Sequence, residues 1–492
     1  MNHIGISCGF HDAGLSVIGN NGEILFAGHS ERYSKYKHDK DLCGDIARDA
    51  LRHITDDYQL HYYEKPWLKA LRQLRAGQRL GPFFMSSIIG PAVMEEFGNR
   101  KVKTHIHHMT HAAAGFQTSP FDNATVVVID AIGELDCITI WDAWYDDNGI
   151  AQYKKLWSRQ YPNSIGLMYS ALTDYVGLKP MDEEYILMGM AAYGKVKYYN
   201  KIESEFLEDR TAMTFKRNLH IGIEDKFFGE ADNMDIAASA QALTEDLIQV
   251  VMSKARMMGK SRNLVYGGGV ALNCLANRLL GNFFEKMWIM PNPGDAGNSL
   301  GAAALGYGKK LIWHDAFLGH NIDGDYPVEA VIQELETNKM VGVANGRAEF
   351  GPRALGNRSL LADPRGSEIK DKVNEIKRRQ KFRPFAPVIL EEHVHDYFDM
   401  PRGWNDSRYM QVIARCRHVD LFPAIVHYDG TSRVQTVQRD GTGIRKLLEA
   451  WYAKTGCPML LNTSLNIRGE PMVNDRFDAD RFEKLYNLRV IS

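Results

Sequence analysis

The sequence predicts an α/β protein in which a duplicated N-terminal domain is followed by a second domain. Two segments share one layout, in which a strand, a polar turn, a second strand, a tight Asn/Gly turn and a third strand follow one another. The first copy runs from IGISCG to EILFAG (4–28), and the second runs from ATVVVID to AQYKKLW (124–157). A new pattern begins after a stretch rich in Pro, Gly and Asp at 315–328, which marks the second domain.

A strand–turn–strand unit that is used twice is typical of the actin, Hsp70 and sugar-kinase superfold, which holds nucleotide phosphates between two acidic turns. We therefore predict an actin-like domain over 1–325 and a second α/β domain over 326–492. Leu residues at helical spacing predict a solvated amphipathic helix over 70–80. A long apolar stripe predicts a core helix over 236–258.

Composition places the chain among ordinary globular proteins. It has 492 residues, of which 45% are hydrophobic and 24% charged, and its net charge is -2. This profile excludes a collagenous or wholly disordered chain, and the charge balance demands neither nucleic acid nor an anionic membrane as partner. No apolar run approaches the roughly 20 residues that a membrane helix needs. Six dispersed cysteines without a CxxC pair, and a start without a secretory pattern, indicate reduced thiols in the cytoplasm.

One spacing of histidines suggests a metal site. His107 and His111 lie four residues apart in a helix-forming stretch, so both imidazoles face one side, about 5–6 Å apart at Cβ. Imidazole suits Zn, Fe, Ni or Cu. Asp130, which ends an apolar strand, and Asp295, in a Gly-rich turn, are natural further ligands, although a carboxylate at such a place can also cap a turn. The pair lacks the Glu of HExxH metalloproteases.

Two further regions suggest anion binding. An apolar run ends in Gly267, Gly268 and Gly269 and opens a helix, a turn at which a ligand can approach the backbone, although such a turn can also serve packing alone. The part after 326 is rich in arginine among Phe, Pro and Gly, which favours a phosphate pocket over a flexible charged tail, while pairing with local acids is an equally open alternative. A turn rich in hydrogen-bond donors follows an apolar strand at 461–471.

These motifs resemble the O-carbamoyltransferase family that includes NodU, CmcH and the tobramycin carbamoyltransferase. The resemblance covers almost the whole chain. It is carried by HDAG, ERYSKYKHD, HHMTHAAAGF, VVVIDAIGE, MGMAAYG, YGGGVALNC, PGDAGNSLGAA, EFGPRALGNRSLLADPR, FRPFAPVI, DGTSRVQTV and NTSLNIRGEP. It implies that the N-terminal domain is similar to TsaD, a tRNA threonylcarbamoyl-transfer enzyme of the actin-like (ASKHA) superfold. The C-terminal domain would be similar to YrdC, an α/β nucleotide-binding fold.

The resemblance also implies a two-step reaction. The YrdC-like domain would make carbamoyl-adenylate from ATP, with Mg(II), and carbamoyl phosphate, and the N-terminal domain would pass the carbamoyl group to a hydroxyl of the acceptor. His107, His111, Asp130 and Asp295 would hold Fe(II) or another divalent metal, which polarises the carbamoyl oxygen. His11 would be the general base, and Lys37 would neutralise phosphate or carbonyl charge.

Binding roles follow from the same resemblance. Nucleotide binding would fall to Gly267, Gly268, Gly269, Asn273, Asn462, Thr463 and Ser464, and the phosphates of ATP and carbamoyl phosphate to Arg347, Arg353, Lys377, Arg379, Arg383 and Arg433. The chain departs from the family pattern at Ala131, Ile186 and Gln380, where the family usually has Gly, Lys and Glu.

The acceptor stays open at this stage. A small-molecule hydroxyl is expected, a nucleotide acceptor is an alternative, and its contacts should come from 41–100 and from loops near His11. Competing interpretations are a tRNA-modifying carbamoyl transferase, which requires a basic RNA-binding face, and a non-catalytic actin-like ATP-binding protein. No membrane partner is expected, nucleic acid is disfavoured, and a homodimer is expected from the family.

Overall fold

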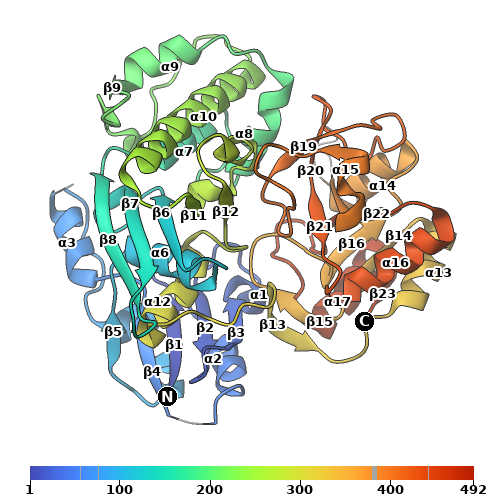
Figure 1. Cartoon of the computed structure of the whole chain (residues 1–492), viewed down its shortest axis with the longest axis horizontal. Coiled ribbons are helices and arrows are strands. Elements are labelled where there is room, and N and C mark those ends of the chain that lie inside the picture. Colours follow the sequence, from blue (N-terminus) through green and yellow to red (C-terminus); the bar gives the residue numbers. More distant parts are fainter. Residues whose placement is uncertain (56, 76, 379–384, 442) are drawn as a thin grey trace.

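The computed structural model of the chain describes residues 1–55, 57–75, 77–378, 385–441 and 443–492. Two parts lie side by side (Figure 1). The N-terminal part, blue to yellow, holds two five-stranded sheets, and the C-terminal part, orange to red, holds a six-stranded sheet. The protein is therefore of mixed α/β class, as predicted.

The first sheet has the strand order β3-β2-β1-β4-β5. Its strands are β1 (Asn2–Ser7), β2 (Gly14–Ile18), β3 (Ile24–His29), β4 (Tyr58–Tyr62) and β5 (Val102–Thr104). Strand β1 pairs antiparallel with β2 and parallel with β4. The strands β1 to β3 are buried along almost their whole length, so this sheet is covered on both faces.

The second sheet repeats this plan in the order β8-β7-β6-β11-β12. Its strands are β6 (Asn123–Ile129), β7 (Asp136–Tyr145), β8 (Ala151–Gln160), β11 (Asn263–Gly267) and β12 (Lys286–Trp288). Strand β6 pairs antiparallel with β7 and parallel with β11, as β1 does with β2 and β4. The predicted duplication is confirmed.

Two helices of small residues fill the space between these sheets. Helix α6 (His107–Thr118) packs on β6 and β11, α12 (Asn298–Tyr307) packs on β1 and β2, and the two helices pack on each other. The fit is close at Gly301, where an added Cβ would lie 1.9 Å from the carbonyl oxygen of Thr110. This packing brings the start of α6 beside the turn that precedes α12.

Other helices cover the outer faces. Helix α10 (Asn233–Met258) packs with α7 (Ile165–Tyr175) over the second sheet, which confirms the core helix predicted at 236–258. The helix predicted over 70–80 lies instead at Pro66–Arg75 (α3), and residues 77–80 are not helical. Gly77 takes a left-handed φ of +66°, which a continuing helix does not allow. The remaining helices of this part are α1 (Glu31–Ser34), α2 (Gly44–Leu51), α4 (Met85–Ile89), α5 (Pro91–Glu96), α8 (Glu184–Met190), α9 (Tyr199–Phe206) and α11 (Cys274–Asn277).

The C-terminal part is built on a mixed sheet in the order β21-β17-β22-β16-β14-β23. The strands are β14 (Met340–Ala344), β16 (Arg358–Ala362), β17 (Ala386–Leu390), β21 (Gln435–Val437), β22 (Met459–Ser464) and β23 (Val490–Ile491). Its helices are α13 (Val328–Asn338), α14 (Glu368–Lys377), α15 (Val394–Tyr397), α16 (Gly443–Thr455) and α17 (Arg476–Tyr486). One hydrophobic core joins these elements.

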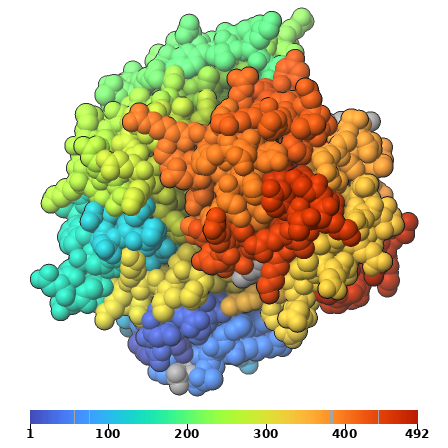
Figure 2. Space-filling view, turned by 45° about the vertical axis from the view of Figure 1, so that its right-hand side comes forward, coloured from blue at the N-terminus to red at the C-terminus, as the bar shows by residue number. Residues whose placement is uncertain are grey.

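The two parts interlock, as the close contact of the orange and yellow-green surfaces in Figure 2 illustrates. Trp404 and Val412 of the C-terminal part lie buried in the core of the second N-terminal sheet. The Trp404 indole donates to the carbonyl of Asn277 at 3.0 Å, and an added Cβ at Gly281 would meet the Arg402 carbonyl at 1.7 Å. Strand β13 (Phe317–Ile322), before the predicted boundary at 325, pairs with β15 (Gly346–Glu349) after it.

All six cysteines are free thiols. Within the described residues, the structure contains no helix that is both long and apolar enough to cross a membrane.

A chain of three histidines in the first sheet predicts acid sensitivity. His3 Nδ1 lies 3.1 Å from His61 Nε2, and His61 Nδ1 lies 3.0 Å from His105 Nε2. Burial lowers the pKa of His3 to about 4, of His61 to about 3 and of His105 to about 4. Below pH 6.5 these histidines become protonated in the unfolded chain but stay neutral in the folded chain. The free energy of unfolding therefore falls as the pH drops from 6.5 to about 3.

We expect His61→Gln to reduce this loss of stability, since it removes one histidine that is protonated only in the unfolded chain. Urea unfolding would measure the free energy of unfolding at pH 7 and pH 5. The variant His395→Gln, at an exposed position, is the matched control. Equal pH dependence in wild type and His61→Gln would contradict this account.

Candidate functional site

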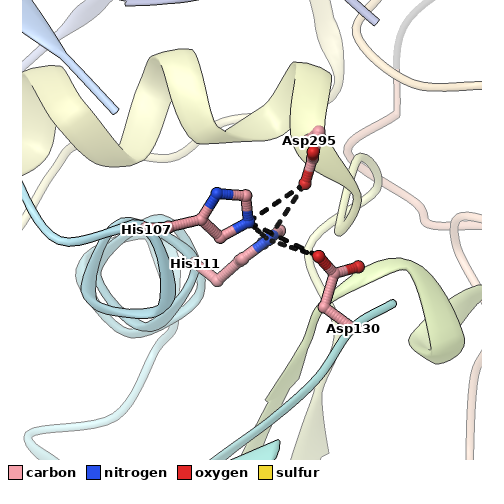
Figure 3. A group of neighbouring side chains, drawn as sticks. All are labelled: His107, His111, Asp130 and Asp295. Carbon is pink, nitrogen blue, oxygen red and sulfur yellow. Dashed lines mark hydrogen bonds and ion pairs between the residues drawn. The ribbon is translucent and has the colours of Figure 1, made fainter. Parts of the chain in front are cut away.

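Four buried side chains converge on one point between α6 and the turn before α12 (Figure 3). His107 and His111 come from the first turns of α6, Asp130 directly follows β6, and Asp295 begins the turn that leads into α12. The Nε2 atom of His107 lies 3.3 Å from Asp295 Oδ1 and 3.4 Å from Asp130 Oδ2. The two Nε2 atoms lie 3.1 Å apart. One potential ligand atom from each residue lies within 4.8 Å of all the others.

This geometry fits a divalent metal. Metal–nitrogen and metal–oxygen bonds of about 2.0–2.2 Å in a tetrahedron place ligand atoms about 3.3–3.6 Å apart, close to the separations found here. The Oδ1 atom of Asp295 lies 3.3 Å from both imidazoles and yet makes no hydrogen bond, and it is buried. Two imidazoles and two carboxylates suit a transition metal. The four residues therefore form a group that could hold one ion.

Electrostatics hold the cluster together without an ion. Burial opposes a charged imidazole, but the carboxylates of Asp295 and Asp130 outweigh it and hold the pKa of His107 well above its usual range. Burial likewise opposes the Asp295 carboxylate, and the histidines, His107 first, hold its pKa well below the usual range. A divalent cation would supply, between the two carboxylates, the positive charge that protonated His107 supplies otherwise.

A row of alternating histidines and carboxylates leads away from this cluster. His11 Nε2 lies 3.4 Å from Asp295 Oδ2, and His11 Nδ1 lies 2.8 Å from Asp12. Despite burial, which favours the neutral ring, Asp295 and Asp12 raise the pKa of His11 to about 9. Asp12 also contacts His38 at 2.6 Å, and His38 contacts Asp182 at 3.0 Å. Both ring nitrogens of His11 are thus held in place.

The glycine turn lies against Asp130. Gly268 has a φ of +88°, and a Cβ there would lie 2.2 Å from the Ile129 carbonyl, so no other residue fits. The Gly269 amide donates to Asp130 Oδ1 at 3.0 Å. Asn273 caps the short helix α11 and pairs with Gln241 at 3.0 and 3.1 Å. The turn therefore orients a carboxylate of the metal group, while Gly269 and Asn273 also face the cavity described next.

A single cavity of about 1090 Å³ joins the two parts of the chain. Most of the predicted site residues line it. From the N-terminal part these are His11, Lys37, Asp130, Gly269, Asn273 and Asp295, and from the C-terminal part Arg353, Lys377, Arg433, Asn462, Thr463 and Ser464. His107 and His111 lie buried behind Asp130 and Asp295. Predicted groups that are hundreds of residues apart in sequence thus meet in one space.

The C-terminal wall is held in place by buried polar contacts. Glu349 is buried, and its Oε1 accepts four backbone N–H groups, those of residues 355–358, at 2.8–3.1 Å. This fixes the loop that carries Arg353 into the cavity. Lys377, at the end of α14, donates to the carbonyl of Ser464 at 2.7 Å and contacts Asn466. The Asn462 amide donates to Ala354 and Gln435 at 3.0 and 2.7 Å.

Some predicted residues do not reach the cavity. Arg347 is not among the described residues that line it, since its guanidinium donates to the carbonyls of Leu25, Leu318 and Gly319 at 2.5–3.3 Å. Gly267 and Gly268 lie at the turn behind the lining. Arg379 and Arg383, like Gln380, fall outside the described residues.

Sequence reasoning missed several residues at this site. His38 lies in ERYSKYKHD and Asn466 and Arg468 in NTSLNIRGEP, so their motifs were noted but not their roles. Asp182 follows no motif, and only its 3.0 Å contact with His38 identifies it. Glu349, which acts through four backbone amides, carries no signal in sequence beyond its place in EFGPRALG.

Comparisons with known proteins agree with this arrangement. The family model described as Carbamoyltransferase N-terminus matches residues 47–304, and the model described as Carbamoyltransferase C-terminus matches 332–491. An uncharacterised protein of Synechocystis sp. is 32% identical, over 98% of this chain and 94% of its own length. Nodulation protein NolNO of Sinorhizobium fredii is 28% identical, over 95% of this chain and 76% of its own.

A third relative has a named activity. The 3'-hydroxymethylcephem-O-carbamoyltransferase of Amycolatopsis lactamdurans is 27% identical, over 95% of this chain and 94% of its own length. Among solved structures, the activator of the 2-hydroxyisocaproyl-CoA dehydratase from Clostridium difficile is 13% identical, over 62% of this chain and 94% of that chain. Its TM-score of 0.35 establishes no common fold. On the family models and the Synechocystis relative together, the chain belongs to the carbamoyltransferase family and is an enzyme of that family.

Proposed function

We propose that this chain is an ATP-dependent O-carbamoyltransferase that works in two steps. In the first, carbamoyl phosphate loses its phosphate to water, and the carbamate oxygen attacks the α-phosphorus of ATP, which expels pyrophosphate and leaves carbamoyl-adenylate. In the second, a hydroxyl of a small-molecule acceptor attacks the carbamoyl carbon, and AMP leaves. The observation that carries the proposal is the single cavity that joins a cationic, amide-rich wall to the four-residue metal group.

The C-terminal wall supports the first step. Arg353, Lys377 and Arg433 offer cations to phosphate oxygens, and Asn462 and Thr463 offer hydrogen-bonding groups to the nucleotide. Lys377 is the last residue of α14, and its ammonium group contacts Ser464 at the end of β22. The side chain is 9% exposed, so its charge acts in a site from which most water is excluded. Arg347 is not among the described residues of this wall, and Arg379 and Arg383 lie outside the described residues, so the phosphate-binding roles of all three stay predictions.

The N-terminal wall supports the second step. His107, His111, Asp130 and Asp295 would hold a divalent metal, iron(II) by the family resemblance, which when bound polarises the carbamoyl oxygen as a Lewis acid. His11, held by Asp12 and Asp295, would receive the proton of the attacking hydroxyl as the neutral ring. A divalent cation bound at Asp295 would favour that form, because it opposes the carboxylate charge that raises the pKa of His11. Lys37 lines the same space and would stabilise negative charge on the adenylate phosphate. Gly269 and Asn273 would contact the nucleotide.

Further features of the proposal rest on the resemblance. They are the TsaD-like and YrdC-like character of the two parts, with the boundary at 325/326, Mg(II) with ATP, and a homodimer. The duplicated sheet order is the plan that the actin-like prediction requires.

Isotope exchange tests the first step directly. Purified full-length protein is expected to exchange labelled pyrophosphate into ATP when carbamoyl phosphate is present. Exchange that is equally fast without carbamoyl phosphate, or absent with it, would rule out the proposed activation step. Metal analysis of the same preparation should find about one divalent ion per chain. Protein that is stripped of this ion by chelation and returned to buffer with Mg(II) should keep the exchange while transfer to an alcohol stops.

A further inference from the structure

A second, smaller cavity of about 290 Å³ opens beside the large one. It is bounded by the turn after β1, the turn after β6, helix α7, the loop that follows α7, and the short 3₁₀ helix at Leu219–Ile221. His11, Ala131, Ser170 and Met181 line both cavities. A molecule seated in the small cavity therefore has direct access to His11 and to the metal group behind it.

The walls of this cavity are apolar. Leu167, Ile132 and Leu219 are 5%, 9% and 2% exposed and form its buried floor. Phe10 and Ile221, which are 45% and 83% exposed, stand at its rim. A hollow with a buried apolar floor and apolar side chains at its rim has the lining that is usual for a small-molecule site. The volume lies just below the ~300–1,000 Å³ usual for such sites, which fits a compact ligand.

Few charges face the hollow. Besides His11, the described residues that line it include one carboxylate, Asp174, and no lysine or arginine. His220 is turned toward Tyr161, whose hydroxyl lies 3.5 Å from its Nδ1. Ser170 Oγ donates to Glu184 at 2.5 Å. A phosphorylated acceptor would find no lysine or arginine among these described residues, and a polyamine would find a single exposed carboxylate.

We propose that the small cavity binds the acceptor, and that this acceptor is an uncharged alcohol with a compact hydrocarbon or aromatic body. This inference rests on the proposed function. The body would lie on Leu167, Ile132 and Leu219, and the hydroxyl would reach the large cavity past Ala131 and His11. The alcohol oxygen bonds to the carbamoyl carbon and the bond from that carbon to the adenylate oxygen breaks, giving an alkyl carbamate, AMP and one proton.

Competing acceptors test the class. Full-length, metal-loaded protein with ATP and labelled carbamoyl phosphate is offered benzyl alcohol and cyclohexylmethanol, and in parallel glycerol, tobramycin and uridine monophosphate. We expect kcat/KM for the two apolar alcohols to exceed that for the polar acceptors about tenfold or more. Pyrophosphate exchange is measured first. If exchange is absent, the proposed function fails, whereas exchange with preference for a polar acceptor overturns only the acceptor inference.

A rim variant tests the location. Ile221→Glu places a carboxylate at an 83% exposed position, where folding is not at risk, and we expect it to lower kcat/KM for cyclohexylmethanol about tenfold while exchange stays unchanged. Ile312→Glu is the matched control, since Ile312 is 43% exposed and lies outside the cavity lining. Calorimetric titration of cyclohexylmethanol into both variants gives a second readout, independent of turnover. Equal kcat/KM and equal affinity for cyclohexylmethanol in Ile221→Glu and Ile312→Glu would overturn the placement of the acceptor in the small cavity.

Discussion

The His111→Ala variant is expected to lose carbamoyl transfer about a thousandfold while it keeps carbamoyl-phosphate-dependent pyrophosphate exchange. His111 is buried, and its Nε2 lies 3.3 Å from Asp295 Oδ1 and 2.9 Å from the Asn298 amide. Removing one of two imidazoles weakens any hold on a cation, and loss of a Lewis acid removes several kcal/mol of transition-state stabilisation. In the proposed mechanism the exchange reaction uses the other wall of the cavity, so it should continue.

His108→Gln is the matched control for this experiment. His108 is equally buried on the same helix, but its Nδ1 bonds to Thr139 at 2.9 Å and it is not one of the four converging residues. Product mass, pyrophosphate exchange and metal content should be measured on both variants. Loss of neither activity in His111→Ala, or loss of both with normal circular dichroism, would refute the division of labour between the two walls.

The converse result is expected for Lys377→Met. Lys377 lies at the end of α14, and its ammonium group contacts the Ser464 carbonyl at 2.7 Å and the Ser464 hydroxyl at 3.3 Å, at the edge of the cavity. A cation held in a water-poor site raises the rate of a step about a hundredfold to a thousandfold where negative charge develops in that step. We therefore expect exchange to fall by that factor, while chemically prepared carbamoyl-adenylate is still used for transfer.

Lys372→Met on the same helix separates this effect from a general loss of charge. Lys372 is exposed, so its removal should change neither reaction. If Lys377→Met keeps full exchange, Lys377 has no part in the activation step and serves only to join α14 to β22. A fall in both reactions with an unchanged unfolding midpoint would place Lys377 in the transfer step as well.

The convergence of His107, His111, Asp130 and Asp295 was the part of the site that the sequence predicted best. Helical spacing alone puts His107 and His111 on one face, and this holds in α6. Their two carboxylate partners could be named only as candidates, because the positions of Asp130 and Asp295 depend on the packing of α6 against α12. Local pattern fixes which side chains share an element, and tertiary packing decides which elements meet.

Arginine roles were harder to predict for the same reason. Arg347 and Arg353 belong to one motif, yet Arg353 lines the cavity and Arg347 donates to the carbonyl of Leu25, 322 residues earlier in the chain. A guanidinium satisfied by carbonyls of a distant strand has the same sequence signature as one that binds phosphate. The small cavity was equally hidden, since its floor is assembled from three separate segments of the N-terminal part.

The burial of Trp404 and Val412 in the N-terminal core limits how such proteins can change their acceptor specificity. A chimera that took its C-terminal half from another relative would have to bring along the receiving surface around Asn277 and Gly281, or leave a hole in a packed interior. New specificity is therefore more accessible through local change at the rim formed by Phe10 and Ile221 than through recombination of halves.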